Sequence, residues 1–243
     1  MSLTLNVSRG RSRTPGAVDS GLLSNFSPLA VPAIQAWYDS NVGVFKDAGI
    51  TPAVENDPVQ QHNDQSGNGN HRTQATLAKR PLYKKNIQNG RPIIRYDGVN
   101  DFLEKVWGAP IAQPNTFFIV LNQFVTPGCV YDGTTGCANR NQFGGGMQAG
   151  VVLGGPTLVV PSGFILFTCI FNGGASFMYL NGYQVASGNV GAQTSGAYRT
   201  GTNCNETTPM QMDEAESIIY NAAVSNANRL SVEAYLKQKW GTP

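Results

Sequence analysis

Two carboxylates stand two positions apart in Met210 to Tyr220, a stretch whose residues alternate as they do in a strand. Side chains at i and i+2 of a strand point to the same face, so we expect Glu214 and Glu216 to share one. A retaining glycosidase needs two carboxyl groups about 5 Å apart. Glycan cleavage is therefore one hypothesis, although Ser217 and Ile218 follow where a third carboxylate would be needed.

Other catalytic patterns are weaker. A Ser/His/Asp hydrolase would have to use His62 or His71, which both lie in polar loops, and no Gly-x-Ser-x-Gly elbow occurs. Gly144-Gly145-Gly146 opens no helix, so it indicates a flexible loop rather than a phosphate site. We therefore expect no catalytic residues and a protein that is not an enzyme.

Asp and Asn oxygens gather in two loops and could hold structural calcium. We favour the alternative that both loops are Asx-type turns, in which the side chains bond their own backbone. The two histidines show no zinc-ligand spacing, so no metal and no cofactor is predicted. The two loops hold Asp64 with Asn68 and Asn70, and Asp97 with Asn100 and Asp101.

The four cysteines lie far apart and form no Cys-x-x-Cys motif. Cys169 lies within an apolar run, and we expect it to be a buried thiol. A bridge between Cys129 and Cys137 would cross a Gly-rich loop, and the sequence leaves that pairing open.

The stretch from Phe164 to Gly188 organises the rest of the chain. Phe164 to Phe171 is rich in β-branched and aromatic residues and predicts a strand. Asn172-Gly173-Gly174 turns the chain into a second strand, Ser176 to Leu180. Asn181-Gly182 then suits a type I′ hairpin, because both central positions of that turn need positive φ. A third strand completes an antiparallel meander, which is typical of an all-β domain.

Further strands and one helix complete the predicted domain. Thr116 to Phe124 is apolar on both faces and suits the middle of a sandwich. Ser225 is a good N-cap for a helix over Asn226 to Lys239, in which we expect Glu233 and Lys237 to form an i,i+4 charge pair. The other predicted strands are Ala33 to Tyr38, Arg91 to Tyr96, Gly150 to Leu153, Thr157 to Val160 and Met210 to Tyr220.

Composition excludes several classes of protein. The 243 residues carry a formal net charge of +2, which gives no reason to expect nucleic acid or an anionic membrane as a partner. No apolar run reaches the roughly 18 residues of a membrane span, and the first 16 residues show no secretory signal. Charged residues make up only 13% of a chain rich in glycine and proline, which fits a turn-rich, folded β protein.

Residues 1–32 differ from the rest of the chain. Arg9, Arg11 and Arg13 precede the first acidic residue, Asp19, among serine, glycine and proline. This composition is typical of a flexible tail, and the alternative is an arm that a neighbouring subunit or a larger assembly holds. We therefore divide the chain into an N-terminal arm, residues 1–32, and one domain, residues 33–243.

Several motifs occur in an order that resembles a known family. They are Trp37-Tyr38-Asp39, HNDQSGNGN from His62, NGRPIIRYDGVNDFL from Asn89, Leu180-Asn181-Gly182, AESIIY from Ala215 and VEAYLKQKWG from Val232. The set is similar to the laminin-G-like jelly rolls of the concanavalin A-like lectin and glucanase superfamily, in its bacterial and phage branch. The resemblance departs in residues 1–32 and in the loops at 126–148 and 194–209, the second of which we expect to be long and polar.

The resemblance implies an antiparallel jelly-roll β-sandwich with one C-terminal helix and an extended N-terminal arm. Glucanases of the superfamily carry Glu-x-Asp-x-x-Glu on one strand, a pattern that this chain lacks. Such folds bind sugars through exposed aromatic faces together with amide, carboxylate and arginine side chains of the loops. The glycan-binding candidates here are Trp107, Tyr131, Asn139, Arg140, Asn141, Tyr198 and Arg199.

A fold does not by itself define an activity. Our leading prediction is a non-enzymatic bacteriophage virion protein, a fibre, tail or capsid decoration subunit that is made in the host cytoplasm and displayed at the virion surface. Its arm, with Arg9, Arg11 and Arg13, would dock to other virion proteins, and its lectin-like domain would bind host or environmental glycans. We expect a homo-oligomer or a larger assembly. The alternative is a carbohydrate-binding module of a bacterial surface or secreted protein.

Overall fold

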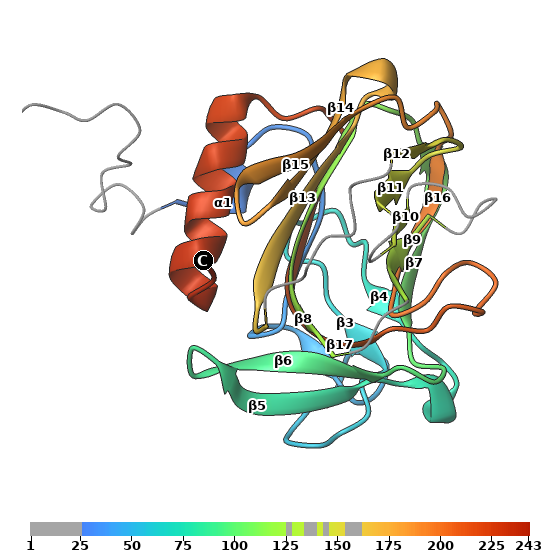
Figure 1. Cartoon of the computed structure of the whole chain (residues 1–243). Coiled ribbons are helices and arrows are strands. Elements are labelled where there is room, and N and C mark those ends of the chain that lie inside the picture. Colours follow the sequence, from blue (N-terminus) through green and yellow to red (C-terminus); the bar gives the residue numbers. More distant parts are fainter. Residues whose placement is uncertain (1–25, 125–127, 134–139, 143–145, 154–161) are drawn as a thin grey trace, which may run out of the picture.

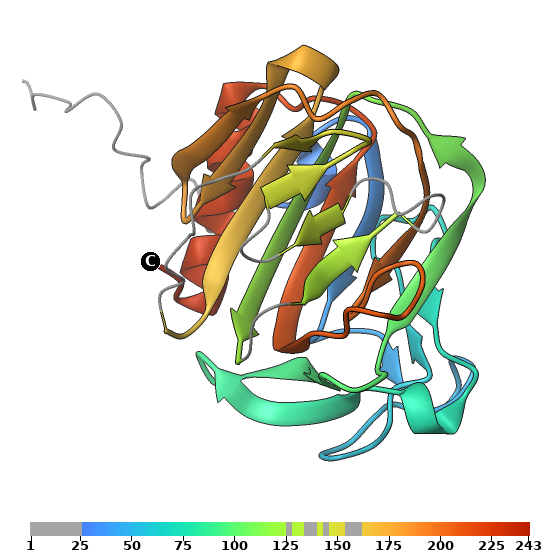
Figure 2. The same ribbon diagram turned by 45° about the vertical axis from the view of Figure 1, so that its right-hand side comes forward.

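The computed structural model describes residues 26–124, 128–133, 140–142, 146–153 and 162–243, with the backbone alone for 140–142. Two antiparallel sheets pack face to face, and a helix, α1 (Asn226–Trp240), lies against the outer face of one of them (Figure 1, Figure 2). The predicted all-β sandwich with one C-terminal helix is confirmed. Arg9, Arg11 and Arg13 of the predicted arm lie outside the described residues.

Eight strands form the first sheet: β1 (Ile34–Asp39), β5 (Leu82–Gln88), β6 (Arg91–Asp97), β8 (Asn115–Gln123), β13 (Ile165–Phe171), β14 (Ser176–Leu180), β15 (Tyr183–Gly188) and β17 (Gln211–Tyr220). They run in the order β15-β14-β13-β8-β17-β6-β5, and β1 also pairs with β17. We call this the inner sheet, because it lies between the second sheet and α1 (Figure 1).

Nine strands form the second sheet, the outer sheet: β2 (Val44–Phe45), β3 (Gln61–His62), β4 (Arg72–Thr73), β7 (Leu103–Ile111), β9 (Cys129–Asp132), β10 (Arg140–Gln142), β11 (Gly146–Gln148), β12 (Val152–Leu153) and β16 (Ser195–Thr200). They run in the order β12-β11-β10-β9-β16-β7-β4-β3-β2. Short 3₁₀ helices lie at η2 (Pro28–Ala30), η3 (Leu77–Lys79) and η4 (Gly173–Ala175).

The inner sheet is covered on both faces, which explains the apolar runs of its central strands. Phe117 of β8 belongs to the core between the two sheets, whereas its neighbour Phe118 belongs to the core under α1. Every residue of β13 is buried, with Phe167 in the core between the sheets and Leu166 in the core under α1. Burying one such large apolar side chain stabilises a fold by about 1.5–3 kcal/mol. The two cores therefore hold the three layers together.

The turn between β14 and β15 has the predicted type I′ geometry. Asn181 has a φ of +51° and Gly182 a φ of +83°, and both central positions of this turn require positive values. The side chain of Asn181 also accepts a hydrogen bond from the backbone N–H of Leu166, at 2.8 Å. The predicted meander is confirmed, and its second turn is fixed against β13.

Helix α1 begins at its predicted N-cap and ends at Trp240, one residue beyond the predicted Lys239. The Ser225 hydroxyl accepts a backbone N–H of the first turn, and Gly241 ends the helix in the left-handed region with a φ of +65°. Val232, Leu236 and Trp240 form a fully buried ridge against the inner sheet. This buried ridge fixes the rotation of α1 about its own axis. It thereby determines which helix residues lie beside the ridge, at the border between sheet and solvent.

Two loop predictions need correction, at residues 126–148, which contain β9, β10 and β11, and at residues 194–209. Residues 194–209, predicted as a long polar loop, contain β16, whose side chains are all buried where it pairs with β7 and β9. Strand formation there depends on long-range pairing, which overrides a polar local sequence. Strand β12 lies within the predicted stretch Gly150 to Leu153, and the strand predicted at Thr157 to Val160 lies outside the described residues.

Part of the predicted arm packs on the domain. Val31 is buried, and the Tyr220 hydroxyl donates to the Pro28 carbonyl oxygen at 3.0 Å. Phe26 packs on Tyr235 of α1, with ring centroids 5.9 Å apart. Residues 26–32 therefore pack on the domain beside the helix.

Candidate functional site

A buried polar cluster, which we call the inter-sheet cluster, surrounds Glu214 of β17. Arg72 of β4 forms an ion pair with it, with Nη1 3.0 Å from Oε1, and both side chains are shielded from water. The Tyr96 hydroxyl donates to Oε2 at 2.8 Å, and Ser217 donates to Oε1. Tyr38 lies under the Arg72 guanidinium, 4.3 Å from it to the ring centroid. The protein itself thus uses the hydrogen-bonding capacity of this carboxylate.

His62 completes the inter-sheet cluster as a neutral ring. Its Nδ1 lies 3.0 Å from Nη2 of Arg72, a group that only donates, so the ring proton sits on Nε2 and is donated to the Asp39 carbonyl oxygen at 3.0 Å. Burial, helped by the charge of Arg72, lowers the pKa of His62 to about 4. Burial works to raise the pKa of Glu214, but the charge of Arg72 and the hydrogen bonds from Arg72 and Ser217 together outweigh it and hold that pKa below its ordinary value.

Glu216 lies in a separate cluster on the face of β17 that packs against α1. The indole N–H groups of Trp37 and Trp240 each donate to it at 2.7 Å, and Lys239 Nζ lies 2.6 Å from Oε2. Burial raises the pKa of Glu216, and the neighbouring Asp39 carboxylate adds to that rise. This carboxylate fastens the C-terminal helix to the sheet.

A β-bulge separates the two carboxylates. Glu214 pairs with Leu121 and Glu216 with the adjacent Val120, so Ala215 is the extra residue on β17. The insertion turns Glu216 to the opposite face of the strand, which explains why the two carboxylates share no hydrogen-bond partner. The prediction that both carboxylates share one face is wrong. A pair on opposite faces cannot act together on one glycosidic bond.

The aromatic residues predicted to bind glycans lie in the core between the sheets. Tyr131 and Tyr198 are each 1% exposed and Trp107 is 5% exposed. Tyr198 stacks on Tyr38 with ring centroids 5.9 Å apart, and Phe117 stacks on Tyr131 at 5.0 Å. The prediction took these rings for surface groups, but strands β7, β9 and β16 direct them inward. They stabilise the sandwich and present no open face to a sugar.

Of the polar residues predicted to bind glycans, the structure describes the side chain of Arg199 alone. Arg199 is almost buried, and its Nη2 forms an ion pair with Glu104 at 2.9 Å. Asn139 lies outside the described residues, as do the side chains of Arg140 and Asn141. A glycan-binding role for these last three residues stays a prediction.

The two loops considered for calcium are Asx-type turns, as we favoured. Asp64 accepts the backbone N–H groups of Ser66 at 2.8 Å and Asn70 at 3.0 Å, and Asp97 accepts that of Val99 at 2.7 Å. These bonds engage the carboxylate oxygens with the loops themselves. Within the part of the chain that the structure describes, no three His, Cys, Asp or Glu side chains are arranged to hold a metal ion.

The structure decides whether Cys129 forms the disulfide that the sequence left open. Cys129 and Cys169 are buried and take part in no disulfide, which excludes a Cys129–Cys137 bridge and confirms Cys169 as a buried thiol. Cys204 is disulfide-bonded. A disulfide is typical of proteins that work in an oxidising environment.

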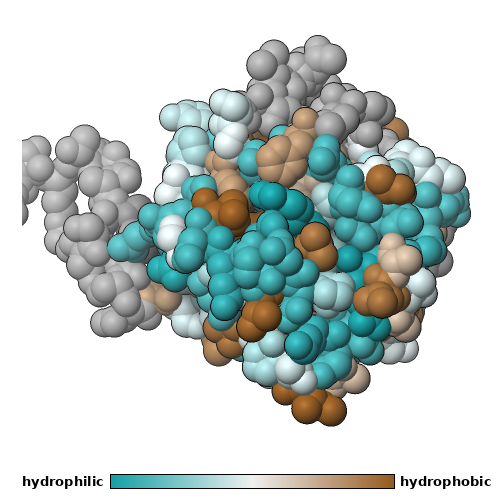
Figure 3. All heavy atoms as spheres, turned by 90° about the horizontal axis from the view of Figure 1, so that it is seen from below, coloured by the Kyte–Doolittle hydropathy of each residue, from teal (hydrophilic) through white to brown (hydrophobic). Residues whose placement is uncertain are grey.

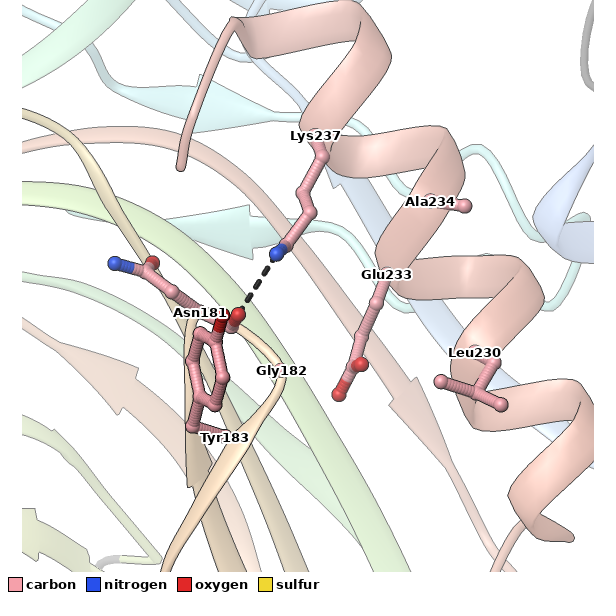
Figure 4. A pocket seen from close by; sticks show the side chains of 7 residues that line it. All are labelled: Asn181, Gly182, Tyr183, Leu230, Glu233, Ala234 and Lys237. Atoms are coloured by element: carbon pink, nitrogen blue, oxygen red, sulfur yellow. Dashed lines mark hydrogen bonds between the residues drawn. The ribbon is translucent and has the colours of Figure 1, made fainter. Parts of the chain in front are cut away.

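A pocket of about 260 Å³, which we call the α1 pocket, lies between the β14–β15 turn and the helix (Figure 4). Its helical residues follow the spacing i, i+3, i+4, i+7, which places them on one flank of α1. Sites for drug-sized ligands measure about 300–1,000 Å³, so this pocket suits a ligand group the size of a single ring. Its lining consists of Asn181, Gly182 and Tyr183 from the turn, and Leu230, Glu233, Ala234 and Lys237 from α1.

Polar groups form one side of the α1 pocket. Glu233 Oε2 lies 2.6 Å from Arg229 Nη1, and Oε1 accepts from the Thr168 hydroxyl at 2.9 Å. Lys237 reaches from α1 towards the turn, where its Nζ donates to the Asn181 carbonyl oxygen at 2.7 Å (Figure 4). The predicted Glu233–Lys237 charge pair is therefore wrong. Glu233 instead forms its ion pair with Arg229, one turn earlier on the helix, and Lys237 donates its hydrogen bond to the Asn181 carbonyl oxygen.

Exposed apolar groups form the other side of the α1 pocket. The Tyr183 side chain is 78% exposed and Leu230 is 44% exposed. A flat apolar ring beside hydrogen-bonding groups suits a sugar, which has an apolar C–H face and polar edges. Gly182 keeps the pocket open, because a Cβ there would lie 3.4 Å from Glu233 Oε2 and 3.5 Å from Lys237 Nζ.

None of the α1 pocket residues was among the predicted site residues. The signals in the sequence are a tyrosine directly after a tight turn and a row of residues beside the buried ridge of α1. Each signal is common in proteins of any function. Only the tertiary structure, which docks the turn against α1, brings Tyr183 and Lys237 to one site.

The face of the molecule seen in Figure 3 shows hydrophobic residues scattered among hydrophilic ones, without one broad apolar patch. Single exposed apolar residues are ordinary on protein surfaces. None of the helices in the described part of the chain is long and apolar enough to cross a membrane.

No protein-family model and no curated protein matches the chain in sequence. Solved structures do match its fold. Domain 4 of AbnA, a GH43 extracellular arabinanase from Geobacillus stearothermophilus in complex with arabinotriose, has a TM-score of 0.55 at 12% identity, over 83% of this chain and 98% of that one. A GH54 α-L-arabinofuranosidase soaked with a cyclic sulfate inhibitor has a TM-score of 0.51 at 16% identity, over 74% of this chain and 50% of that one.

The chain is a distant structural match to β-sandwich domains of carbohydrate-binding and glycosidase proteins. The resemblance predicted from the sequence is confirmed at this coarser level. The chain spans about half the length of the arabinofuranosidases that it matches, and nearly all of the arabinanase domain. A likeness at these identities defines the fold alone, so function has to be argued from the site.

Proposed function

We propose that this chain is a non-enzymatic glycan-binding domain whose sugar site is the α1 pocket. The observation that carries the proposal is the exposed ring of Tyr183, which lines the same hollow of single-ring size as Lys237. The fold supports it, because this chain spans almost the whole of an arabinanase domain that was solved with arabinotriose. Of the functions considered from the sequence, this corresponds to the carbohydrate-binding module.

The absence of catalysis is part of the proposal. Its support is that Glu214 and Glu216, the carboxylates considered for glycan cleavage, are buried on opposite faces of β17 and bonded to other side chains. Incubation of the chain with polysaccharides should release no reducing sugar. Release that disappears in Glu214→Gln or Glu216→Gln, with the fold retained, would overturn this part of the proposal.

Binding of the full chain to a panel of oligosaccharides that includes arabinotriose tests the main proposal, with isothermal titration calorimetry as the measurement. Tyr183→Ala should weaken binding about tenfold, which corresponds to ~1.4 kcal/mol, because it removes the stacking surface. Phe124→Ala is the matched control, since Phe124 is exposed but does not line the pocket. Equal affinities of Tyr183→Ala and the wild type would place the sugar elsewhere, and no binding to any glycan would refute the function.

The location at a virion surface and the docking role of the arm remain proposals. Because residues 26–32 pack on the domain, a deletion that tests the arm should end at residue 25. The shortened chain should keep its glycan binding and its melting temperature but lose incorporation into particles. Normal incorporation without residues 1–25 would refute the docking role of Arg9, Arg11 and Arg13.

A further inference from the structure

The α1 pocket has an unbalanced charge. Its one carboxylate, Glu233, is already neutralised by Arg229 and accepts the Thr168 hydroxyl on its other oxygen. Arg229 is further engaged by Asn226 Oδ1 at 2.7 Å and by the ring of Tyr179, 4.0 Å from its guanidinium carbon. The arginine and the glutamate therefore form a closed pair at the base of the pocket.

Lys237 carries a positive charge that this ion pair does not neutralise. Its ammonium group has three donor hydrogens, and the Asn181 carbonyl oxygen accepts one of them. No acidic side chain among the described residues lies within ion-pair distance of Lys237, whereas Lys239, two positions on, has two carboxylate partners. The Lys237 side chain is only half-buried, so a ligand in the pocket can reach it.

We propose that the α1 pocket selects acidic sugars, with Lys237 binding the carboxylate of a uronic acid and Tyr183 packing against its ring. This inference rests on the proposed glycan-binding function and names the class of glycan. A charged hydrogen bond formed in a partly shielded pocket is stronger than one between neutral groups, so Lys237 favours an anion over a hydroxyl. The apolar wall of Tyr183 and Leu230 favours a ring over a small inorganic anion.

The carbonyl that holds Lys237 also sets where the anion binds. Asn181 is fixed by its bonds to the Leu166 backbone, and its carbonyl oxygen keeps Nζ at the mouth of the turn. The lysine is thus positioned before the ligand arrives, which reduces the entropy lost on binding. Tyr183 follows on the same turn, so the cation and the ring are held by one hairpin.

The experiment compares trigalacturonic acid with neutral galactotriose and arabinotriose, by titration calorimetry on the full chain at low and at physiological salt. We expect the acidic trisaccharide to bind about tenfold more tightly than the neutral ones, with an affinity that falls as salt rises. Lys237→Met should remove both the preference and the salt dependence. Lys85→Met removes the same charge from the exposed edge strand β5 and should change neither.

The outcomes separate this inference from the proposed function. Equal binding of acidic and neutral glycans, unaffected by Lys237→Met, overturns the acidic-sugar inference and leaves the glycan-binding function standing. Absence of binding to either class refutes both. Competition by millimolar inorganic sulfate or phosphate, together with equal binding of sulfated and carboxylated trisaccharides, also overturns the inference, because the pocket would then be a general anion site.

Discussion

Two regions of this protein each pair a buried carboxylate with an arginine, and they differ in what surrounds the pair. In the inter-sheet cluster, Glu214 and Arg72 lie between two sheets, and the hydroxyl groups of Tyr96 and Ser217 also donate to the carboxylate. In the α1 pocket, Glu233 and Arg229 lie between α1 and strands β13 and β14, and beside them Lys237 and Tyr183 reach solvent. An arginine–glutamate pair thus lies in the interior of the first region and at the base of the pocket in the second.

The difference shows which polar groups of this fold are available to a ligand. Burying an ion pair has a desolvation cost, which is offset only if the geometry is good and further hydrogen bonds are made. In the inter-sheet cluster, protein groups supply the counter-ion and the hydrogen bonds of Glu214, so this carboxylate is not available to a ligand. In the α1 pocket the same holds for Glu233, whereas Lys237 can still donate hydrogen bonds to a ligand. Stability should therefore depend mainly on the cluster, and binding on the pocket.

The largest effect should follow from breaking the inter-sheet ion pair. Arg72→Met keeps a long side chain over Tyr38 but leaves the Glu214 carboxylate buried without its counter-ion. Breaking such a pair from one side costs about 3–5 kcal/mol. Chemical denaturation at pH 7 should show a loss of that size in the free energy of unfolding.

A double variant sharpens this prediction. Arg72→Met with Glu214→Gln removes both charges, so its loss should be smaller than the sum of the two single losses. Additive losses, or a single loss below about 1 kcal/mol, would contradict the view that this pair supports the sandwich.

The next effect is a pH dependence of stability that arises in the inter-sheet cluster. His62 has a pKa of about 4 in the folded protein, below the 6.5 of an ordinary histidine, so the unfolded chain binds more protons between these values. Its neutral form stabilises the fold above pH 6.5, and that contribution is lost as the pH falls towards 4. The loss amounts to about 3 kcal/mol.

His62→Gln isolates that contribution, because Gln keeps one donor for the Asp39 carbonyl and one acceptor for Arg72 but does not titrate. Unfolding measured at pH 7 and pH 4.5 should show a smaller acid-induced loss in the variant than in the wild type. The two carboxylates that face the ring, Glu214 and Asp39, are unchanged in the variant. Equal losses in both proteins would show that the histidine is not buried as a neutral group.

The sequence predicted the architecture well where local and long-range requirements agree. The Asn181-Gly182 turn, the doubly apolar β8 and the Ser225 cap each follow from rules that act over a few residues. Predictions failed where long-range pairing decides the outcome. The β16 segment is polar enough to suggest a loop, and only its neighbours β7 and β9 make it a buried strand.

The candidate site was predicted less well, for a related reason. Tyr131 and Tyr198 lie in polar segments of the kind that form binding loops, but in the fold both rings are buried between the two sheets. A single bulge at Ala215 reverses the face of Glu216, and no residue type in the sequence signals that bulge. The α1 pocket joins two segments about 50 positions apart, Asn181 to Tyr183 and Leu230 to Lys237, whose contact depends on the docking of the helix.

The smallest effects compare two side chains of the α1 pocket itself. Glu233→Gln leaves Arg229 without its counter-ion between α1 and the inner sheet, which should cost about 2 kcal/mol of unfolding free energy. Lys237→Met removes one bond from a half-exposed ammonium group, so its loss should stay within about 1 kcal/mol. Thermal melts of both variants measure this difference. If Lys237→Met proved the more destabilising of the two, Lys237 would serve to fasten the hairpin to α1, and the contrast between a closed cluster and an open pocket would fail.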